Sequence, residues 1–180
     1  MTEQPAEPLV LPRRSQIEPF VGYKEVSLKL ERGKLLLSGH RGTYSSSIEV
    51  ATCEQDAKCT DAPNPDCECG LYAYGERSRV YSPTILATVE LFGKVIVHEL
   101  GFRSSHQRIV ALEMQSDCDA CALFNDGRRR ADGFYFGVQA YRAQALCHEH
   151  GELAMRLNAA MRFTSDDIAR AFGVETTWLP

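Results

Sequence analysis

The sequence has little that would insert it into a membrane or export it. Among its 180 residues no apolar run approaches the roughly 20 residues of a membrane-spanning helix. The N-terminal sequence MTEQPAEPLVLPRR lacks the basic start and the continuous apolar segment of a secretory signal peptide. We therefore expect a cytoplasmic protein.

The sequence also lacks the motifs of two large enzyme classes. It has neither a glycine-rich phosphate-binding loop nor a Gly-x-Ser-x-Gly elbow, so the common nucleotide-binding and serine-hydrolase arrangements are excluded. Charge of one sign is not in large excess, because 20 Lys and Arg residues face 24 Asp and Glu residues. A net charge of −4 and a pI near 5.7 argue against a global attraction to nucleic acid or anionic lipid, although a local basic patch is compatible with them.

What the sequence does contain in quantity is cysteine. The composition is otherwise that of a globular protein, with 44% hydrophobic and 24% charged residues. Seven cysteines cannot all pair as disulfides, because the number is odd and a reducing compartment disfavours the bond. Metal ligation is therefore the better explanation.

The first cysteine cluster spans residues 53–69. This stretch includes Pro63 and Pro65 and almost no apolar side chain, so only cross-linking or metal could order it. Four thiolates form a closed, structural zinc site. The predicted ligands are Cys53, Cys59, Cys67 and Cys69. The alternatives are four thiols in a loop without metal, or a redox pair.

The second cluster consists of a Cys-x-x-Cys motif at 118–121 and, further along the chain, the segment CHEH at 147–150. This plan, just ahead of a helix, is common for a zinc site with three cysteine ligands and one histidine. The predicted ligands are Cys118, Cys121, Cys147 and His150, with His148 as the alternative to His150. The two sets use all seven cysteines, so we expect two zinc ions per chain. A thioredoxin-like redox motif is disfavoured, because no apolar strand precedes it.

The chain as a whole predicts an α+β fold, with a strand-rich, zinc-stabilised body and a helical C-terminal appendage. Four prolines in residues 1–19 predict an extended arm. Residues 20–115 predict a β-rich domain that carries the four-cysteine zinc loop. Residues 116–162 predict a zinc-ribbon-like module, with three cysteine ligands and one histidine, plus a helix. Residues 163–180 predict a C-terminal docking helix, or hook.

Alternation of apolar and polar residues indicates the strands of the body. Residues 23–37 predict a β-hairpin, residues 40–47 a loop or irregular edge, and residues 85–99 a strand that pairs with residues 108–114. Within residues 85–99, Gly93 predicts a bulge or a close backbone approach. The residues expected to face the core there are Val89, Leu91, Val95 and Val97.

Helical spacing appears only in the last 30 residues. One set of apolar residues at this spacing is Leu153, Leu157, Ala160 and Met161. A second helix is expected from Ser165, which can cap it, to Gly173, which ends it. With Trp178 it would make an apolar hook that docks a partner. The alternative is that the hook folds back onto the body.

Two segments carry a resemblance, CECGLYA at 67–73 and VELFGKVIVHELGFR at 89–103. They resemble a group of small actinobacterial and actinophage proteins of unknown function, over residues 20–112. The resemblance implies no activity, because none is assigned to the group. This chain departs from the group in having only a short segment between Ala73 and Ile85, where the others carry a longer helical stretch.

Catalytic zinc motifs are incomplete. The dipeptide His98-Glu99 begins like the zinc-protease helix, but the required second histidine would fall at position 102, which is phenylalanine. The zinc-deaminase pattern needs a His-x-Glu upstream of the Cys-x-x-Cys, and here the histidine beside Glu149 lies downstream, within a complete ligand set. We predict no catalytic residue, and a zinc hydrolase or deaminase is our third hypothesis.

A basic run, Arg128, Arg129 and Arg130, precedes the aromatic segment 134–136. Such a loop could contact phosphates while the aromatic rings stack on bases. The alternative is a solvated loop with the rings in the core. A nucleic-acid-binding regulator that uses this loop is our second hypothesis.

Our first hypothesis is a non-enzymatic, zinc-stabilised binding or structural module. As a phage product it would be a virion component or a host-directed interaction protein. A protein partner would be contacted by the N-terminal arm and the C-terminal helix.

Overall fold

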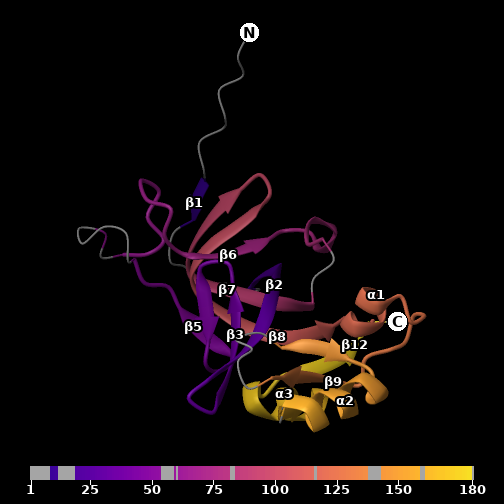
Figure 1. Cartoon of the computed structure of the whole chain (residues 1–180). Coiled ribbons are helices and arrows are strands. Elements are labelled where there is room, and N and C mark those ends of the chain that lie inside the picture. The colour runs from indigo at the N-terminus through magenta and orange to yellow at the C-terminus, as the bar shows by residue number, and fades with distance from the viewer. Residues whose placement is uncertain are drawn as a thin grey trace.

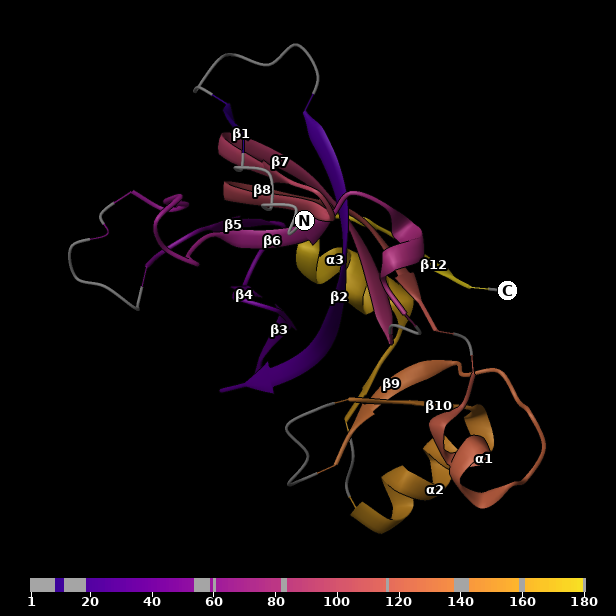
Figure 2. The same cartoon turned by 90° about the horizontal axis from the view of Figure 1, so that it is seen from above.

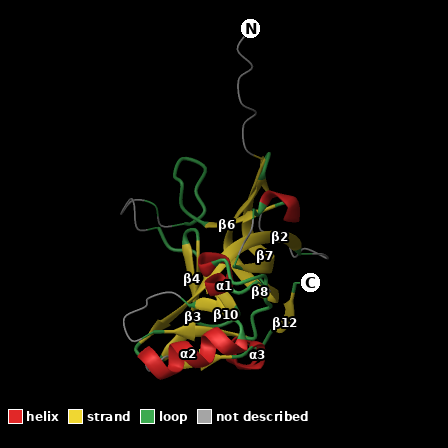
Figure 3. Cartoon of the chain, turned by 45° about the vertical axis from the view of Figure 1, so that its right-hand side comes forward, coloured by secondary structure: helices red, strands yellow, loops and turns green. Residues whose placement is uncertain are grey.

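The computed structural model describes residues 9–11, 19–53, 59, 61–81, 84–115, 117–137, 143–158 and 161–179. In this part of the chain strands predominate, and Figure 3 shows the helices α2 and α3 at one end of the molecule. The predicted α+β class is therefore confirmed. The same residues include no helix that is long and apolar enough to span a membrane.

The strands form a large sheet and a small one. The large sheet contains β1 (Leu9–Leu11), β2 (Phe20–Glu31), β3 (Lys34–Gly39), β4 (Gly42–Tyr44), β5 (Ile48–Val50), β6 (Leu71–Tyr74), β7 (Ile85–His98), β8 (Gly101–Met114) and β12 (Glu175–Trp178). The small sheet contains β9 (Gly133–Phe136), β10 (Gln144–Leu146) and β11 (Met161–Phe163). The helices are α1 (Asp119–Phe124), α2 (His148–Asn158), α3 (Ser165–Phe172) and the short 3-10 helix Arg77–Arg79. Figures 1 and 2 show α1, α2 and β9 grouped beside the large sheet, and Figure 2 shows β10 with them.

Pairing in the large sheet runs in a closed circuit. Strand β2 pairs with β7, β7 with β8, and β8 with β6, all antiparallel. The circuit closes where Tyr23 of β2 pairs with Tyr74 of β6. Because the sheet curls back on itself, side chains from strands far apart in the sequence meet inside it. The buried core there includes Val26, Leu37, Leu91 and Ile109.

The predicted hairpin is formed by β2 and β3. Its register runs from Val26 opposite Gly39 to Glu31 opposite Lys34. Arg32 and Gly33 between them have φ angles of 50° and 76°, the left-handed conformation that a tight hairpin turn requires.

The bulge predicted at Gly93 is also confirmed. The β7–β8 register shifts between Phe92 and Val95, and Gly93 has a φ of 74°. A Cβ atom on Gly93 would lie 2.3 Å from the Ser105 Oγ, so this position needs glycine for space as well as for conformation.

The bulge changes which residues of β7 are buried. The expected core residues Val89, Leu91 and Val95 are buried. Ile96, which simple alternation places on the outer face, is fully buried as well, whereas Val97 is only partly buried. The expectation for Val97 was therefore wrong, and beyond the bulge two successive residues, Val95 and Ile96, are both buried.

Residues 40–47 contain a short strand, β4, rather than only loop. It pairs antiparallel with β3 and places the fully buried Tyr44 opposite Leu37. The glycine, serine and threonine content of this segment concealed its one large core residue.

At the N-terminus, Leu9–Leu11 of the predicted arm forms β1, which pairs antiparallel with β7. This short part of the arm therefore belongs to the sheet. Residues 1–8 and 12–18 lie outside the described residues.

Helix α2 ends at Asn158, and its predicted apolar stripe is not buried. Leu153 is 51% exposed and Leu157 is 70% exposed. Met161 lies in strand β11, and Ala160 lies outside the described residues. The side of α2 that packs inward carries Gly151, where a Cβ atom would come within 2.2 Å of the Tyr135 ring.

Helix α3 starts and stops at well-defined caps. Its N-cap is Thr164, not Ser165 as expected, and Thr164 and Asp167 form a reciprocal capping box. Gly173, with a φ of 66°, ends the helix as predicted.

The C-terminal segment belongs to the main core. Ile168 and Phe172 are buried in it, and β12 pairs with β8 in parallel. The Trp178 ring stacks on Phe134, with centroids 5.6 Å apart and planes 13° apart. The expectation of a hook separate from the core was therefore wrong, and the alternative, a segment folded back onto the body, is what the structure has. Its apolar side is occupied by this chain itself.

We expect replacement of Phe172 by alanine to lower the free energy of unfolding by about 3–5 kcal/mol, because it empties a buried aromatic site. Urea denaturation measures the change. The control is Arg170→Ala on the exposed side of the same helix, where we expect at most about 0.5 kcal/mol. Equal effects of the two substitutions would contradict the placement of α3 in the core.

Candidate metal centres

The first cysteine cluster lies on the chain between β5 and β6. Its sulfur atoms meet in pairs, with Cys53 Sγ 3.6 Å from Cys67 Sγ and Cys59 Sγ 3.4 Å from Cys69 Sγ. All four predicted ligand atoms lie within 4.8 Å of one another. The structure therefore brings the whole predicted set together.

These separations suit a tetrahedral metal site. Zinc–sulfur bonds of about 2.3 Å at tetrahedral angles place sulfur atoms about 3.8 Å apart. A disulfide would require about 2.05 Å, and none of the seven cysteines forms one. The first cluster is therefore a candidate metal centre with four sulfur ligands.

Arg103 on β8 connects this centre to the large sheet. Its side chain is buried, and its guanidinium donates to the carbonyl oxygens of Asn64, Cys67 and Cys69. It also donates to Nε2 of His98, at 2.9 Å. Burial and the nearby guanidinium lower the pKa of His98, which keeps this nitrogen available as an acceptor. Three carbonyl groups of the ligand loop are thus held by one guanidinium group.

The second cluster is built from the starts of two helices. Cys118 is the N-cap of α1 and Cys121 lies in its first turn, while Cys147 immediately precedes α2 and His150 lies in its first turn. His150 Nδ1 lies 3.6 Å from Cys118 Sγ, 3.5 Å from Cys121 Sγ and 3.3 Å from Cys147 Sγ. A tetrahedral site with bonds of about 2.3 and 2.05 Å predicts about 3.6 Å for these separations.

His150, and not His148, completes the second set. The alternative residue His148 is exposed, and its Nδ1 lies 3.6 Å from Asp132 Oδ2. The ligand atoms of Cys118, Cys121, Cys147 and His150 lie within 4.8 Å of one another. This cluster is also buried, except for its histidine.

The thiols of both clusters have shifted pKa values. Burial raises the pKa of Cys118, but backbone and side-chain hydrogen bonds with Cys147 and Cys121 together outweigh it and lower the pKa to about 7. A hydrogen bond with Cys69, followed by burial, raises the pKa of Cys59 to about 12. Burial, followed by hydrogen bonds with its cysteine neighbours, raises the pKa of Cys121 to about 11. A metal ion would have to displace protons from such thiols, so acid should oppose its binding.

The aromatic part of the predicted nucleic-acid surface is buried, whereas Arg128 and Arg130 are exposed. Arg128 forms an ion pair with Asp117 at 2.7 Å, and Arg129 is paired with Glu149. The aromatic residues of β9, which were to stack on bases, are buried. The alternative, with these rings in the core, is therefore confirmed for this segment.

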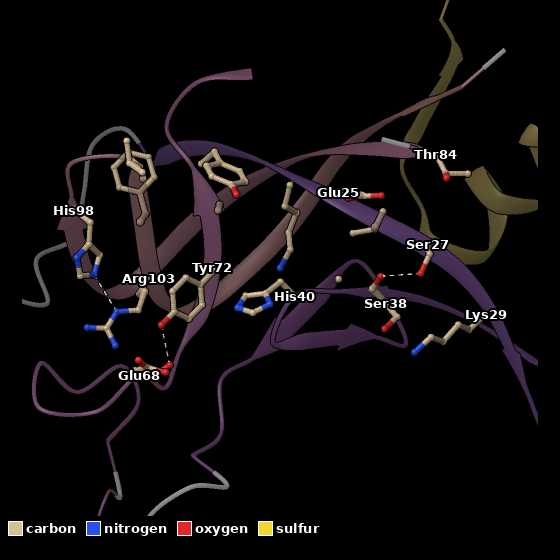
Figure 4. A pocket seen from close by; sticks show the side chains of 18 of the residues that line it. Glu25, Ser27, Lys29, Ser38, His40, Glu68, Tyr72, Thr84, His98 and Arg103 are labelled. Atoms are coloured by element: carbon tan, nitrogen blue, oxygen red, sulfur yellow. Dashed lines mark hydrogen bonds between the residues drawn. The ribbon is translucent and has the colours of Figure 1, made fainter. Parts of the chain in front are cut away.

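A groove of about 1110 Å³ runs across the large sheet between the two metal-binding parts of the chain. It is bounded at one end by residues 65–68 of the first cluster loop, and at the other by Phe134 and Ala143. Figure 4 shows His40, Tyr72 and Arg103 along it. The His40 and Tyr72 rings meet edge to face, with centroids 5.3 Å apart.

A buried lysine on the wall of this groove is the functional-site candidate that sequence reasoning missed. Lys24 is 4% exposed, and its Nζ donates to Tyr44 Oη at 3.1 Å and to Gln107 Oε1 at 3.4 Å. Tyr44 in turn donates to Gln107, which donates to the Leu71 carbonyl at 3.0 Å. The sequence could have indicated this burial through the position of Lys24, which lies two residues before Val26 and therefore on the apolar face of β2.

Burial changes the titration of this group. It lowers the pKa of Lys24 to about 8, although the neighbouring Glu49 acts in the opposite direction. Burial also raises the pKa of Tyr44, and Glu49 adds to that shift. Tyr44 therefore stays protonated over the range in which Lys24 titrates.

Comparison of the chain with protein-family models, with curated proteins and with solved structures found no match. The resemblance to the actinobacterial and actinophage group therefore stays a prediction.

Arg103→Met should weaken metal binding at the first cluster by about 10- to 100-fold, because the loop carbonyl groups lose their donor. Chelator competition followed by mass spectrometry measures this, and the second cluster should retain its ion. The control, Arg41→Met, removes an exposed ion pair with Glu68 of the same loop and should change little. If Arg103→Met matched the control, Arg103 would not support the loop.

For Lys24, the folded-state pKa near 8 lies below the value of 10.5 expected when the chain is unfolded. Between these values the unfolded chain holds a proton that the folded chain has released, so stability rises with pH, by up to about 3 kcal/mol. Urea denaturation should show the free energy of unfolding of the parent rising relative to that of Lys24→Met from about pH 7 to pH 10. The control is Lys29→Met. Over the same pH range, the free energy of unfolding of the parent should not rise relative to that of this variant. If the difference in free energy of unfolding between the parent and Lys24→Met did not change with pH, Lys24 would not be buried as a neutral amine.

Proposed function

We propose that this chain is a non-enzymatic binding module whose fold is stabilised by two zinc ions, one in each cysteine cluster. The observation that supports it most strongly is the geometry of the two ligand sets. Each offers four soft donor atoms within 4.8 Å of one another, at the separations of a tetrahedral site. Of the common metals, zinc prefers such sulfur and imidazole sets.

Complete ligand sets favour a structural over a catalytic role. A catalytic zinc keeps one position open for water or substrate, and four protein ligands leave none. The carboxylate nearest in sequence to the second set, Glu149, is paired with Arg129. These features argue against our hydrolase and deaminase hypothesis.

The energetic contribution of the ions would be large. A structural zinc adds on the order of 10 kcal/mol of apparent folding free energy, which is comparable to the whole stability of a small domain. The first cluster lies in a loop with few apolar residues, so little else can order it. We infer that the loops fold only with metal.

For the binding surface we propose the groove. Its ends are formed by the loop of the first cluster and by residues near β9, so both metal-binding parts would contribute to its shape. It is lined by three basic and three acidic residues, and this balance favours a protein partner over a polyanion. These residues are Lys24, Lys29, Arg103, Glu25, Asp66 and Glu68. A phage or host-directed role, and a cytoplasmic location, stay predictions.

Native mass spectrometry of the purified chain should find two zinc ions. Cys67→Ser and Cys121→Ser should each lose one ion and much of the stability, because a three-ligand site binds zinc less tightly. His150→Ala should lose the second ion, whereas the matched control His148→Ala should keep both. A folded chain without metal, or a disulfide among residues 53–69, would overturn the proposal.

A further inference from the structure

Large apolar side chains are exposed around the second metal cluster. Leu123 and Phe124 at the end of α1 are 77% and 68% exposed, and Leu153 and Leu157 of α2 are 51% and 70% exposed. We name these four residues the knuckle patch. Apolar surface gathered in this way on a folded chain usually marks an interface.

Three of the four side chains, those of Phe124, Leu153 and Leu157, can be placed along one strip. The Phe124 ring lies 6.3 Å from the ring of His150, on the first turn of α2. Leu153 and Leu157 follow His150 by three and seven residues, which places them along the same side of the helix. The strip therefore runs from the tip of α1 along the length of α2.

The size of the strip suits a dimer. At these exposures the four side chains leave on the order of 500 Å² of surface open to water. An interface of ordinary size buries about 800 Å² on each partner, of which roughly 60% is apolar. The knuckle patch thus supplies about the apolar area that one partner needs.

The order of charges along α2 is complementary to that of a second α2 lying antiparallel to it. Glu152 lies in the first half of the helix and Arg156 near its end, while Glu149 is already paired with Arg129 of the same chain. If a second α2 lies antiparallel on the first, each acidic half faces a basic end. The apolar ends also match, because Phe124 at one end of the strip would then cover Leu157 of the other copy.

We propose that the knuckle patch is the interface of a twofold-symmetric homodimer, in which α2 packs antiparallel on α2 of a second copy. The proposal rests on the proposed function in one respect. The second metal centre ties α1 to α2, so metal holds the two parts of the patch together. The substitutions that test it therefore avoid all the metal ligands.

The first test compares molar masses by light scattering and sedimentation. The parent should have twice the 20.1 kDa chain mass. The double variant Leu153→Glu and Leu157→Glu should raise the dimer dissociation constant at least about 100-fold, because it buries unpaired charge in the interface. The matched control is Met155→Glu, which lies on another side of α2 at 40% exposure and should stay dimeric.

The second test exchanges charges. Glu152→Arg should weaken the dimer by placing like charges together, and adding Arg156→Glu should restore it. Each sample is also weighed by native mass spectrometry for bound zinc. A parent that is monomeric with two zinc ions overturns the dimer and leaves the proposed function standing. A glutamate double variant that stays dimeric overturns the knuckle patch as the interface. A zinc-free dimer that the glutamate double variant breaks supports this interface without metal to hold α1 against α2, and it overturns the proposed function instead.

Discussion

Both edges of strand β8 carry hydrogen-bonded neighbours, and the rest of the described structure depends on this double pairing. Strand β7 runs along one edge, while β6, β5 and β12 share the other in succession. Each backbone amide and carbonyl group in such a strand needs a partner. Satisfying them brings together segments from the first, middle and last parts of the chain.

The first metal centre follows from this pairing. The chain leaves β5 with Val50 opposite His106, and it enters β6 with Leu71 opposite Ser104. The two ends of the cysteine loop are therefore held two residues apart on one strand, before any ligand atom is considered. Pairing at the ends removes most of the closure entropy of the loop, and Arg103, the next residue of β8, holds three of its carbonyl groups. A metal ion would complete an arrangement that the sheet has already begun.

The second centre has a different physical basis. Its ligands come from the starts of two helices, where backbone amide groups point outward and stabilise thiolates, as the amide of Cys121 does for Cys118. Its module has few apolar residues inside, and Gly151 lets α2 approach Tyr135 closely. Few side chains of α1 and α2 pack inside this module. The large apolar residues of the two helices therefore lie at the surface.

The sequence by itself determined the features that depend on neighbours along the chain. Cysteine spacing identified both ligand sets, alternation identified the β2–β3 hairpin, Gly93 marked the bulge, and Gly173 marked the end of α3. Only the tertiary structure decided that Lys24 and Tyr44 meet inside the curled sheet, that Ile96 is buried, and that Trp178 stacks on Phe134. These outcomes depend on which strands pair across long separations in the sequence. Local periodicity shows which residues share a face of a strand, but the closure of the sheet decides what that face meets.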